Sequence, residues 1–193
     1  MPKIVGVLAL QGDFKEHIEA LNEIEGVEAR PVKTREQIEA CDALVIPGGE
    51  STTIGKLMER FEIEKPIREM AEAGKPIWGT CAGMIVLAKD IVDSDQWRLG
   101  LMDITVERNA FGRQVDSFET DLPVEGIDEP VRAIFIRAPY VREVCEQCGV
   151  DVLATFEDKI VLCRQGNLLA SAFHPELTDD RRVQKYFLDM IGE

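Results

Sequence analysis

Cys81 stands in the segment 79–83 (GTCAG), directly after the apolar run 76–78 (PIW). A nucleophile with a glycine two residues away on each side, between a predicted strand and a predicted helix, is typical of a nucleophile elbow. The glycines let the backbone turn sharply, so the thiol is exposed and the Ala82 N–H faces a developing oxyanion. A cysteine buried only for packing needs no such glycines. The pattern therefore indicates a catalytic thiol.

A base and a carboxylate lie far downstream in the segment 174–176 (HPE), which holds one of the chain's two histidines. His174 can take the thiol proton, and Glu176 can accept a hydrogen bond from the other imidazole nitrogen. Residues i and i+2 share a face only in extended structure, so we expect this pair at the end of a strand over 168–173. In this chain order, Cys81, His174 and Glu176 predict acyl transfer through a thioester.

The elements that must position these residues follow from the hydrophobic pattern. Strand-like runs alternate with helical repeats in the first half, which indicates right-handed βαβ units and a parallel sheet. The second half carries short strand-like segments divided by turn residues, as in antiparallel hairpins. Strands are predicted over 3–10, 27–32, 43–46, 76–78, 103–107, 114–119, 131–137, 152–156, 159–164 and 168–173, and helices over 13–25, 67–73, 82–89 and 179–191.

Two helix starts carry capping signals. Asp13 and Glu16 form a capping-box pattern for a helix that ends at Gly26. Ser51 or Thr52 can cap the helix after the third strand. Polar side chains at both starts are therefore expected to bond to backbone N–H groups.

A second glycine-rich turn, 47–51 (PGGES), follows the third predicted strand. In open α/β sheets, ligands bind beyond the carboxyl ends of the strands. We therefore expect this turn and 79–83 to meet at one crevice. Because glycines allow close backbone approach, the turn can supply a second oxyanion donor.

Composition bounds the class of protein. The chain has 193 residues, is 45% hydrophobic and carries a net charge of −14. It is long enough to bury a core, and we expect one domain over 1–193. The negative charge argues against a nucleic-acid partner. The sequence lacks both an apolar run of the roughly 20 residues that span a membrane and a signal-peptide layout at its start, so we expect a cytoplasmic protein.

Five cysteines are present, two of them in the lone C-x-x-C segment 145–148. A zinc site would need two more ligands at suitable spacing, and the nearby sequence offers none. We favour two thiols on one short helical face and expect neither a metal nor a cofactor. A disulfide stays open for a hyperthermophilic source.

The motifs resemble those of class I (triad) glutamine amidotransferases, in particular the glutaminase subunits of two-protein pyridoxal 5′-phosphate synthases. The resemblance spans essentially the whole chain and implies the flavodoxin-like three-layer fold of that class, with a mostly parallel sheet and antiparallel strands in the C-terminal half. The cysteine elbow and HPE mark the wider class, and the other segments mark this kind of subunit. The matching segments are 10–12 (LQG), 47–53 (PGGESTT), 79–83 (GTCAG), 107–109 (ERN), 111–118 (FGRQVDSF), 135–139 (FIRAP) and 173–177 (FHPEL).

The resemblance implies hydrolysis of L-glutamine to L-glutamate and ammonia through a γ-glutamyl thioester on Cys81. It implies a partner, the synthase subunit of a large ring-shaped hetero-oligomer, which combines the ammonia with two sugar phosphates. It places Gln11 near the oxyanion hole and the partner interface. The implied glutamine contacts are Gly49, Glu50, Ser51, Arg108, Ile136 and Arg137, and the implied oxyanion donors are Gly49 and Ala82.

Three other interpretations are open. A glutaminase of histidine or purine synthesis would share the elbow, but segments 111–118 and 135–139 count against it. A cysteine-elbow peptidase or chaperone would lack the HPE segment. A non-catalytic glutamine sensor would not need an intact Cys, His and Glu set.

Overall fold

The computed structural model describes residues 1–109, 111 and 116–192. Within these residues ten strands form one sheet, in the order β2-β1-β3-β4-β12-β11-β9-β6-β5, with β10 paired to β11. A separate pair consists of β7 (Ser117–Leu122) and β8 (Val131–Ile136). The strands of the large sheet are β1 (Lys3–Leu8), β2 (Val27–Val32), β3 (Ala43–Ile46), β4 (Ile77–Thr80), β5 (Ala88–Ile91), β6 (Met102–Glu107), β9 (Tyr140–Val144), β10 (Val150–Phe156), β11 (Lys159–Gln165) and β12 (Leu168–Ser171).

The large sheet has a parallel part and an antiparallel part. β2, β1, β3, β4 and β12 run parallel to one another, which suits their nearly continuous apolar sequences. β11 and β9 pair antiparallel with their neighbours, whereas β5 and β6 are parallel. The prediction of a mostly parallel sheet with antiparallel strands in the C-terminal half is confirmed.

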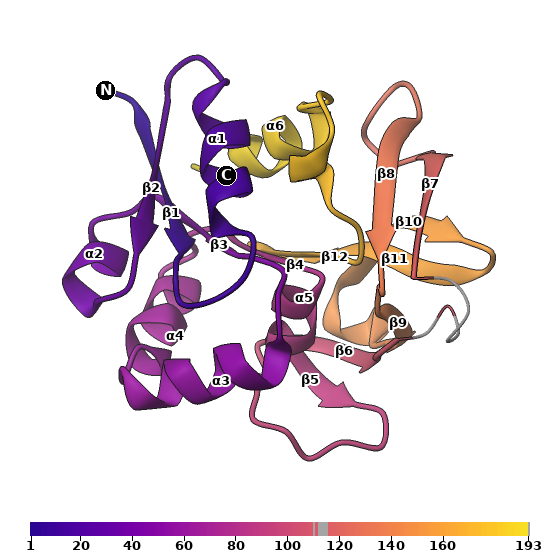
Figure 1. The fold of residues 1–193 in the computed structure, drawn as a ribbon, viewed down its shortest axis with the longest axis horizontal. Coiled ribbons are helices and arrows are strands. Elements are labelled where there is room, and N and C mark those ends of the chain that lie inside the picture. Colours follow the sequence, from indigo (N-terminus) through magenta and orange to yellow (C-terminus); the bar gives the residue numbers. More distant parts are fainter. Residues whose placement is uncertain (110, 112–115, 193) are drawn as a thin grey trace.

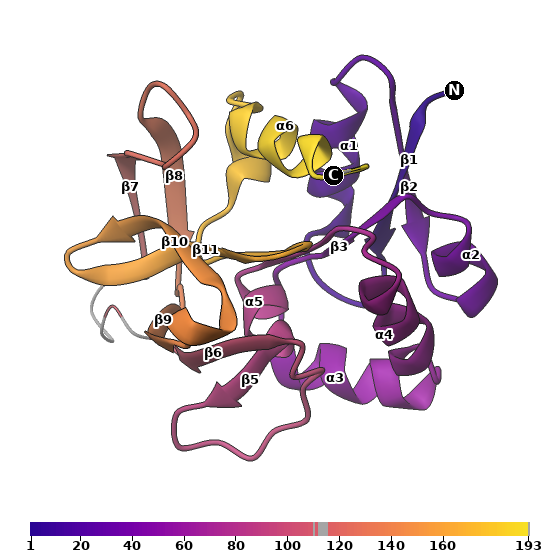
Figure 2. The same cartoon turned by 180° about the vertical axis from the view of Figure 1, so that it is seen from behind.

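Helices cover both faces of the parallel strands, which gives three layers. Figures 1 and 2 show α1 and α6 on one face and α3, α4 and α5 on the other. In the part of the chain that the structure describes, no helix has the length and apolar character needed to cross a membrane. The helices are α1 (Phe14–Asn22), α2 (Arg35–Glu39), α3 (Ser51–Arg60), α4 (Glu64–Glu72), α5 (Ala82–Leu87) and α6 (Arg182–Asp189), and the 3-10 turns are η1 (Glu146–Cys148) and η2 (Pro175–Leu177).

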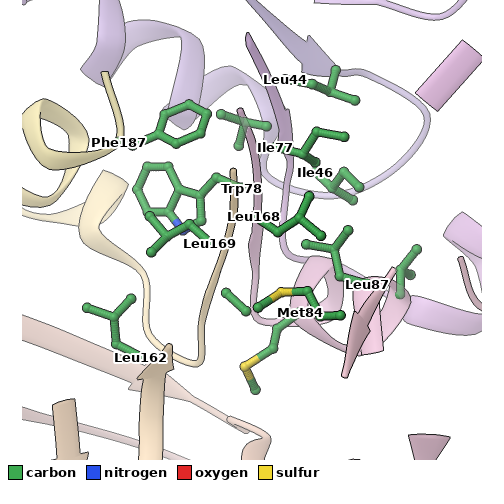
Figure 3. Packing of buried hydrophobic residues seen from close by; sticks show 14 of the residues in the cluster. Leu44, Ile46, Ile77, Trp78, Met84, Leu87, Leu162, Leu168, Leu169 and Phe187 are labelled. Carbon is green, nitrogen blue, oxygen red and sulfur yellow. The ribbon is translucent and has the colours of Figure 1, made fainter. Parts of the chain in front are cut away.

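The core lies on both faces of β4 and β12. Trp78 of β4 packs on Phe187 of α6 with ring centroids 5.3 Å apart, and both side chains are fully buried. On the opposite face, Met84 and Leu87 of α5 are equally buried (Figure 3). The strand that leads to Cys81 is therefore clamped between two helical layers.

Several elements differ from their predicted extent. The closing helix occupies 182–189 rather than 179–191, and α4 begins at Glu64, three residues before its predicted start. α2 and β9 were not predicted, and the predicted elbow helix ends at Leu87 because the next residues pair as β5 with β6. The predicted strand 114–119 starts outside the described residues and continues as β7.

Both capping predictions are wrong. Asp13 precedes α1 but makes no capping hydrogen bond, and its carboxylate instead faces His174. α3 begins at Ser51 itself, and the Ser51 hydroxyl accepts a hydrogen bond from Gln96. In both places the polar side chain is engaged by another part of the fold.

The C-x-x-C segment is also corrected. Cys145 and Cys148 form a disulfide with their Cα atoms 5.2 Å apart, a separation that allows this bond. The favoured pair of free thiols is therefore wrong for this structure. Cys41, Cys81 and Cys163 are free thiols.

Candidate active site

Cys81 sits in a strained turn between β4 and α5. Its backbone has φ 50° and ψ −105°, outside the regions that non-glycine residues normally occupy. The Cys81 N–H donates to the carbonyl of Ser171 at 2.8 Å, which ties the turn to β12. Strain of this kind costs about 1–3 kcal/mol and persists only where surrounding structure enforces it. The predicted elbow is present.

The flanking glycines serve close packing rather than the sharp turn we predicted for them. Gly79 and Gly83 are not among the described residues that have a positive φ. A Cβ on Gly79 would lie 2.4 Å from the carbonyl oxygen of Gly83, and one on Gly83 would lie 2.0 Å from that of Ile46. The glycines therefore let α5 start directly against β4 and β3, while Cys81 itself carries the unusual φ.

His174 is held beyond the end of β12. The backbone N–H of His174 donates to the carbonyl of Ile134 at 2.8 Å, and the ring atom Nδ1 lies 2.6 Å from Oε1 of Glu176. The prediction that this pair ends an extended strand is wrong, because β12 stops at Ser171 and Glu176 lies in the turn η2. The tight turn nonetheless brings the buried carboxylate back onto the ring.

A second carboxylate contacts the same imidazole nitrogen. Oδ2 of Asp13 lies 3.1 Å from Nδ1 of His174, and the Asp13 side chain is 22% exposed. Sequence reasoning missed this role because the capping pattern explained Asp13 locally. The position of Asp13 could have revealed this role, because Asp13 follows β1 at the same edge of the sheet where Cys81 follows β4.

The charges of this cluster depend on one another. Burial alone would lower the pKa of His174, but hydrogen bonds with Asp13, Cys81 and Glu176 outweigh it and raise this pKa. Burial is the largest single influence on the pKa of Asp13 and raises it. Hydrogen bonds with His174 and Glu176 and the attraction of the two histidines together outweigh burial, so this pKa is lowered well below its usual value. Burial raises the pKa of Glu176, and interactions with His17 and His174 offset only part of this rise, so this pKa stays above its usual value. The cluster therefore stabilises the imidazolium that forms when the ring takes a proton from the thiol.

Asp13, His174 and Glu176 also place potential metal-ligand atoms within 4.8 Å of one another. The 2.6 Å separation of His174 Nδ1 and Glu176 Oε1 is that of a short charge-assisted hydrogen bond. We interpret the group as hydrogen bonded, and the expectation that the protein uses no metal stays a prediction.

A cavity of ≈ 900 Å³ opens over the elbow. Cys81 and His174 line it, whereas the Glu176 side chain is fully buried behind the ring. The structure brings all the other predicted site residues to this cavity. They are Gln11, Gly49, Glu50, Ser51, Ala82, Arg108, Ile136 and Arg137.

The turns after β1 and β3 are fastened together at the rim of the cavity. The Asp13 N–H donates to the carbonyl of Gly48 at 3.2 Å, and the Glu50 N–H donates to Oε1 of Gln11 at 2.7 Å. Only glycine fits at Gly12, where a Cβ would lie 1.8 Å from the Gly48 oxygen. Contacts with the turn after β1 therefore hold the peptide after Gly48 in the orientation seen in this structure.

Two arginines approach the cavity from the second half of the chain. Nη1 of Arg108 donates to Oε1 of Gln96 at 2.6 Å, and the Gln96 amide donates to the Ser51 hydroxyl at 3.0 Å. Arg137 has φ 42°, and its backbone N–H donates to the carbonyl of Asp116. Gln96 lies in a segment without a motif, so sequence reasoning missed it.

Part of the motif 111–118 lies outside the described residues, which include only Phe111 and 116–118 of it. Phe111 packs on Phe118 and Phe135 with centroids 5.3 and 5.7 Å away. This aromatic cluster joins the cavity wall to the β7–β8 pair.

Comparison with known proteins decides the family. The sequence profile of the SNO glutamine amidotransferase family matches residues 7–193. The chain belongs to this family. Two similar proteins, both named pyridoxal 5′-phosphate synthase subunit PdxT, come from Moorella thermoacetica and Niallia circulans. They are 60% identical over 190 residues (97% of this chain, 99% of the relative) and 58% identical over 189 residues (98% of each), respectively.

Solved structures share the fold of this chain. A crystal structure described as a glutamine amidotransferase has a TM-score of 0.92 and 55% identity, covering 98% of this chain and 99% of that one. PurLQS from Thermotoga maritima has a TM-score of 0.72 at 20% identity, covering 97% of this chain and 98% of its own. The second likeness concerns the fold alone. The predicted class I glutamine amidotransferase-like fold is confirmed.

Proposed function

We propose that this chain is the glutaminase subunit of a pyridoxal 5′-phosphate synthase. It hydrolyses L-glutamine to L-glutamate and ammonia through a γ-glutamyl thioester on Cys81. The observation that carries the chemistry is the strained Cys81 elbow, which shares a cavity with a histidine whose Nδ1 lies 2.6 Å from a buried carboxylate. The relatives named PdxT, at up to 60% identity over nearly the whole chain, support the choice of pathway.

Proton transfer starts the reaction. Nδ1 of His174 is occupied by carboxylates, so Nε2 is the nitrogen left to take the Cys81 proton. The thiolate then attacks the γ-amide carbon of glutamine, and the carbonyl oxygen becomes an oxyanion. The first-turn N–H of Ala82 has no intrahelical acceptor and is suited to bind this oxyanion. The Gly48–Gly49 peptide is the second candidate donor.

Collapse of the tetrahedral intermediate releases ammonia. His174 returns its proton to the departing nitrogen, the carbon–nitrogen bond breaks, and the acyl group stays on Cys81 as a thioester. Water then attacks the thioester carbonyl while the same ring takes its proton. The carbon–sulfur bond breaks, the ring returns the proton to the Cys81 sulfur, and L-glutamate leaves. Glu176 and Asp13 stabilise the imidazolium during both halves of the reaction.

The rest of the cavity suits the amino-acid end of glutamine. The α-carboxylate needs cationic donors, which Arg108 and Arg137 supply at the rim. The α-ammonium needs oxygens, for which Glu50 and Ser51 are the candidates. Ile136 lines the same wall of the cavity, and its backbone is a further candidate contact for the substrate. These roles are part of the proposal.

We further propose that the chain acts as one domain over 1–193 and docks in the cytoplasm onto a ring-shaped synthase assembly. It needs neither nucleic acid nor membrane for this. Gln11 and the start of α1 are candidate docking positions, because Gln11 already contacts the turn that follows β3.

The turn after β3 offers a simple switch for partner control. The carbonyl of Gly48 accepts the Asp13 N–H, so reversing this peptide needs that hydrogen bond to break. Glycines tolerate either sign of φ, which keeps such a reversal cheap. A partner that binds one orientation better would shift the population toward it.

The proposal is tested by reconstituting the synthase reaction. The chain is mixed with the synthase subunit of a relative, glutamine, ribose 5-phosphate and glyceraldehyde 3-phosphate, and the absorbance of pyridoxal 5′-phosphate is followed. The wild-type chain should support product formation from glutamine. Cys81→Ala should abolish it, and added ammonium salt should restore it, since the synthase then receives ammonia directly. Wild-type chain that forms no glutamate under these conditions contradicts the proposal.

A further inference from the structure

The chain's other histidine, His17, lies next to the catalytic cluster without reaching the cavity. It is on α1 and is fully buried, with its ring edge-on to Trp78 at a centroid distance of 5.9 Å. Its Nε2 lies 3.0 Å from the hydroxyl oxygen of Thr80, the residue before Cys81, and 3.5 Å from Oε2 of Glu176. A buried polar ring at this place needs an explanation beyond packing.

Glu176 lies between the two histidines. Its Oε1 is 2.6 Å from Nδ1 of His174, whereas its Oε2 has no hydrogen-bond partner within the described residues and lies 3.5 Å from Nε2 of His17. A buried carboxylate oxygen without a donor is costly, because burial removes the water that would otherwise bond to it. The His17 ring is thus the group placed to compensate Oε2.

The hydrogen-bonding pattern selects the tautomer of His17. Nδ1 is buried and has no partner among the described residues, so a proton there would be left unbonded. A proton on Nε2 instead faces both the Thr80 hydroxyl and the Glu176 carboxylate. The ring therefore presents an N–H to the carboxylate.

We propose that His17 is a positioning residue: its Nε2–H holds the Glu176 carboxylate ionised and turned so that Oε1 faces His174. The inference rests on the proposed glutaminase reaction and adds a residue that touches neither substrate nor thiol. The titratable groups that face Glu176 are His174, His17 and Asp13. Asp13 is negative, so without the His17 N–H the carboxylate would more readily take up a proton, and His174 would lose an ionic partner.

Two variants separate donation from packing. His17→Phe keeps the ring volume and removes the N–H, whereas His17→Gln places an amide N–H near the position of Nε2. With the full chain bound to the synthase subunit, His17→Phe should lower kcat for glutamine by about tenfold or more, the loss of one hydrogen bond to a charged group. KM should stay within about twofold. The acid limb of the pH profile should move to higher pH, and His17→Gln should recover most of both effects.

A second readout does not depend on turnover. The chain has only two histidines, so ¹⁵N-labelled imidazole spectra of the wild type and the variants can be assigned by subtraction. Wild-type His17 should show the Nε2–H tautomer. The titration midpoint of His174 should fall by about one pH unit in His17→Phe and less in His17→Gln, because its carboxylate partner is weakened.

The outcomes are distinguishable from those of the proposed function. A wild-type chain without glutaminase activity, whose His174 midpoint still falls in His17→Phe, would remove the function and keep the positioning role. An active wild type with an Nδ1–H tautomer at His17, an unmoved His174 midpoint, or equal losses in both variants would overturn this inference. If His17→Phe fails to fold, the wild-type tautomer alone decides.

Discussion

His174 faces two carboxylates, and this arrangement sets the chemistry at the residue scale. Glu176 is fully buried and Asp13 is partly exposed, yet both approach the same Nδ1 atom. With Nδ1 held, the opposite nitrogen is directed to the thiol. The proposed triad is therefore extended by an aspartate, and the two acids are expected to contribute unequally.

The three triad residues should act as a unit. His174→Ala removes the base, so we expect kcat/KM for glutamine to fall by about 10³-fold or more, and Glu176→Gln to cost less. Because Glu176 acts only through the ring, the double variant should be little worse than His174→Ala alone. Steady-state kinetics of the partner-bound chain check this, and losses that multiply would show that the residues act separately.

Asp13 should stabilise the fold in a pH-dependent way. Its pKa is lowered from 3.8 in the folded chain, so its contribution is present above about pH 4 and is lost as the pH falls through the folded value. Asp13→Asn should lower the free energy of unfolding by about 1–3 kcal/mol at pH 7. This difference should shrink below pH 3.8.

Urea unfolding at several pH values measures this difference. Asp90→Asn is the matched control, because Asp90 makes an exposed ion pair with Arg98 and should change little. Equal effects of the two substitutions at pH 7 would argue against a structural role of Asp13 at His174.

At the scale of elements, the elbow depends on two close backbone contacts that leave no room for a side chain, one between Gly79 and Gly83 and one between Gly83 and Ile46. Gly83→Ala would push a Cβ against the carbonyl of Ile46, so we expect a loss of about 1–3 kcal/mol in stability together with a displaced Cys81. Gly26→Ala is the control, since its Cβ meets nothing within 4 Å and only its positive φ is strained. Thermal unfolding should detect both variants, but glutamine turnover should fall only in Gly83→Ala.

Hydrophobic periodicity predicted the parallel strands and most helices because their buried faces repeat regularly. It could not predict β5, whose residues read as the end of a helix until β6 lies beside them. The HPE pair was assigned to extended structure, although the compact turn η2 serves the same contact. Prediction from local sequence fails where contact with a distant segment determines the secondary structure.

The residues of the candidate site likewise divide into those that the local sequence predicts and those that depend on distant segments. Motif residues such as Cys81 and His174 were predictable because their types and flanking residues carry chemical meaning. Asp13 was given a local capping role, and Gln96 has no local signal at all. Their contacts depend on strands that meet only in the folded sheet.

For the whole molecule, the order of strands decides where function lies. β1, β3, β4 and β12 are neighbours and parallel, so the turns after their carboxyl ends meet at one edge. A partner that docks at this edge, as we propose, would contact these turns directly. Control of catalysis by such docking would need no long-range change in the core.

The isolated chain should be a poor glutaminase. Free ammonia is lost to protonation and diffusion, and one misaligned oxyanion donor costs about 10²–10³ in kcat. Glutamate release should therefore rise by a similar factor when the synthase subunit is added, and equal rates with and without it would refute partner control. Gln11→Ala, which removes the bond to the Glu50 N–H, should weaken the activation more than the binding of glutamine.

Labelling of the nucleophile tests the central claim most directly. The partner-bound chain is treated with a glutamine-analogue electrophile, digested and mapped by mass spectrometry, with excess glutamine as the protecting control. We predict one adduct, on Cys81, that glutamine suppresses and that Cys81→Ala lacks while keeping its fold. An adduct on Cys41, Cys145, Cys148 or Cys163 in place of Cys81 would contradict the account.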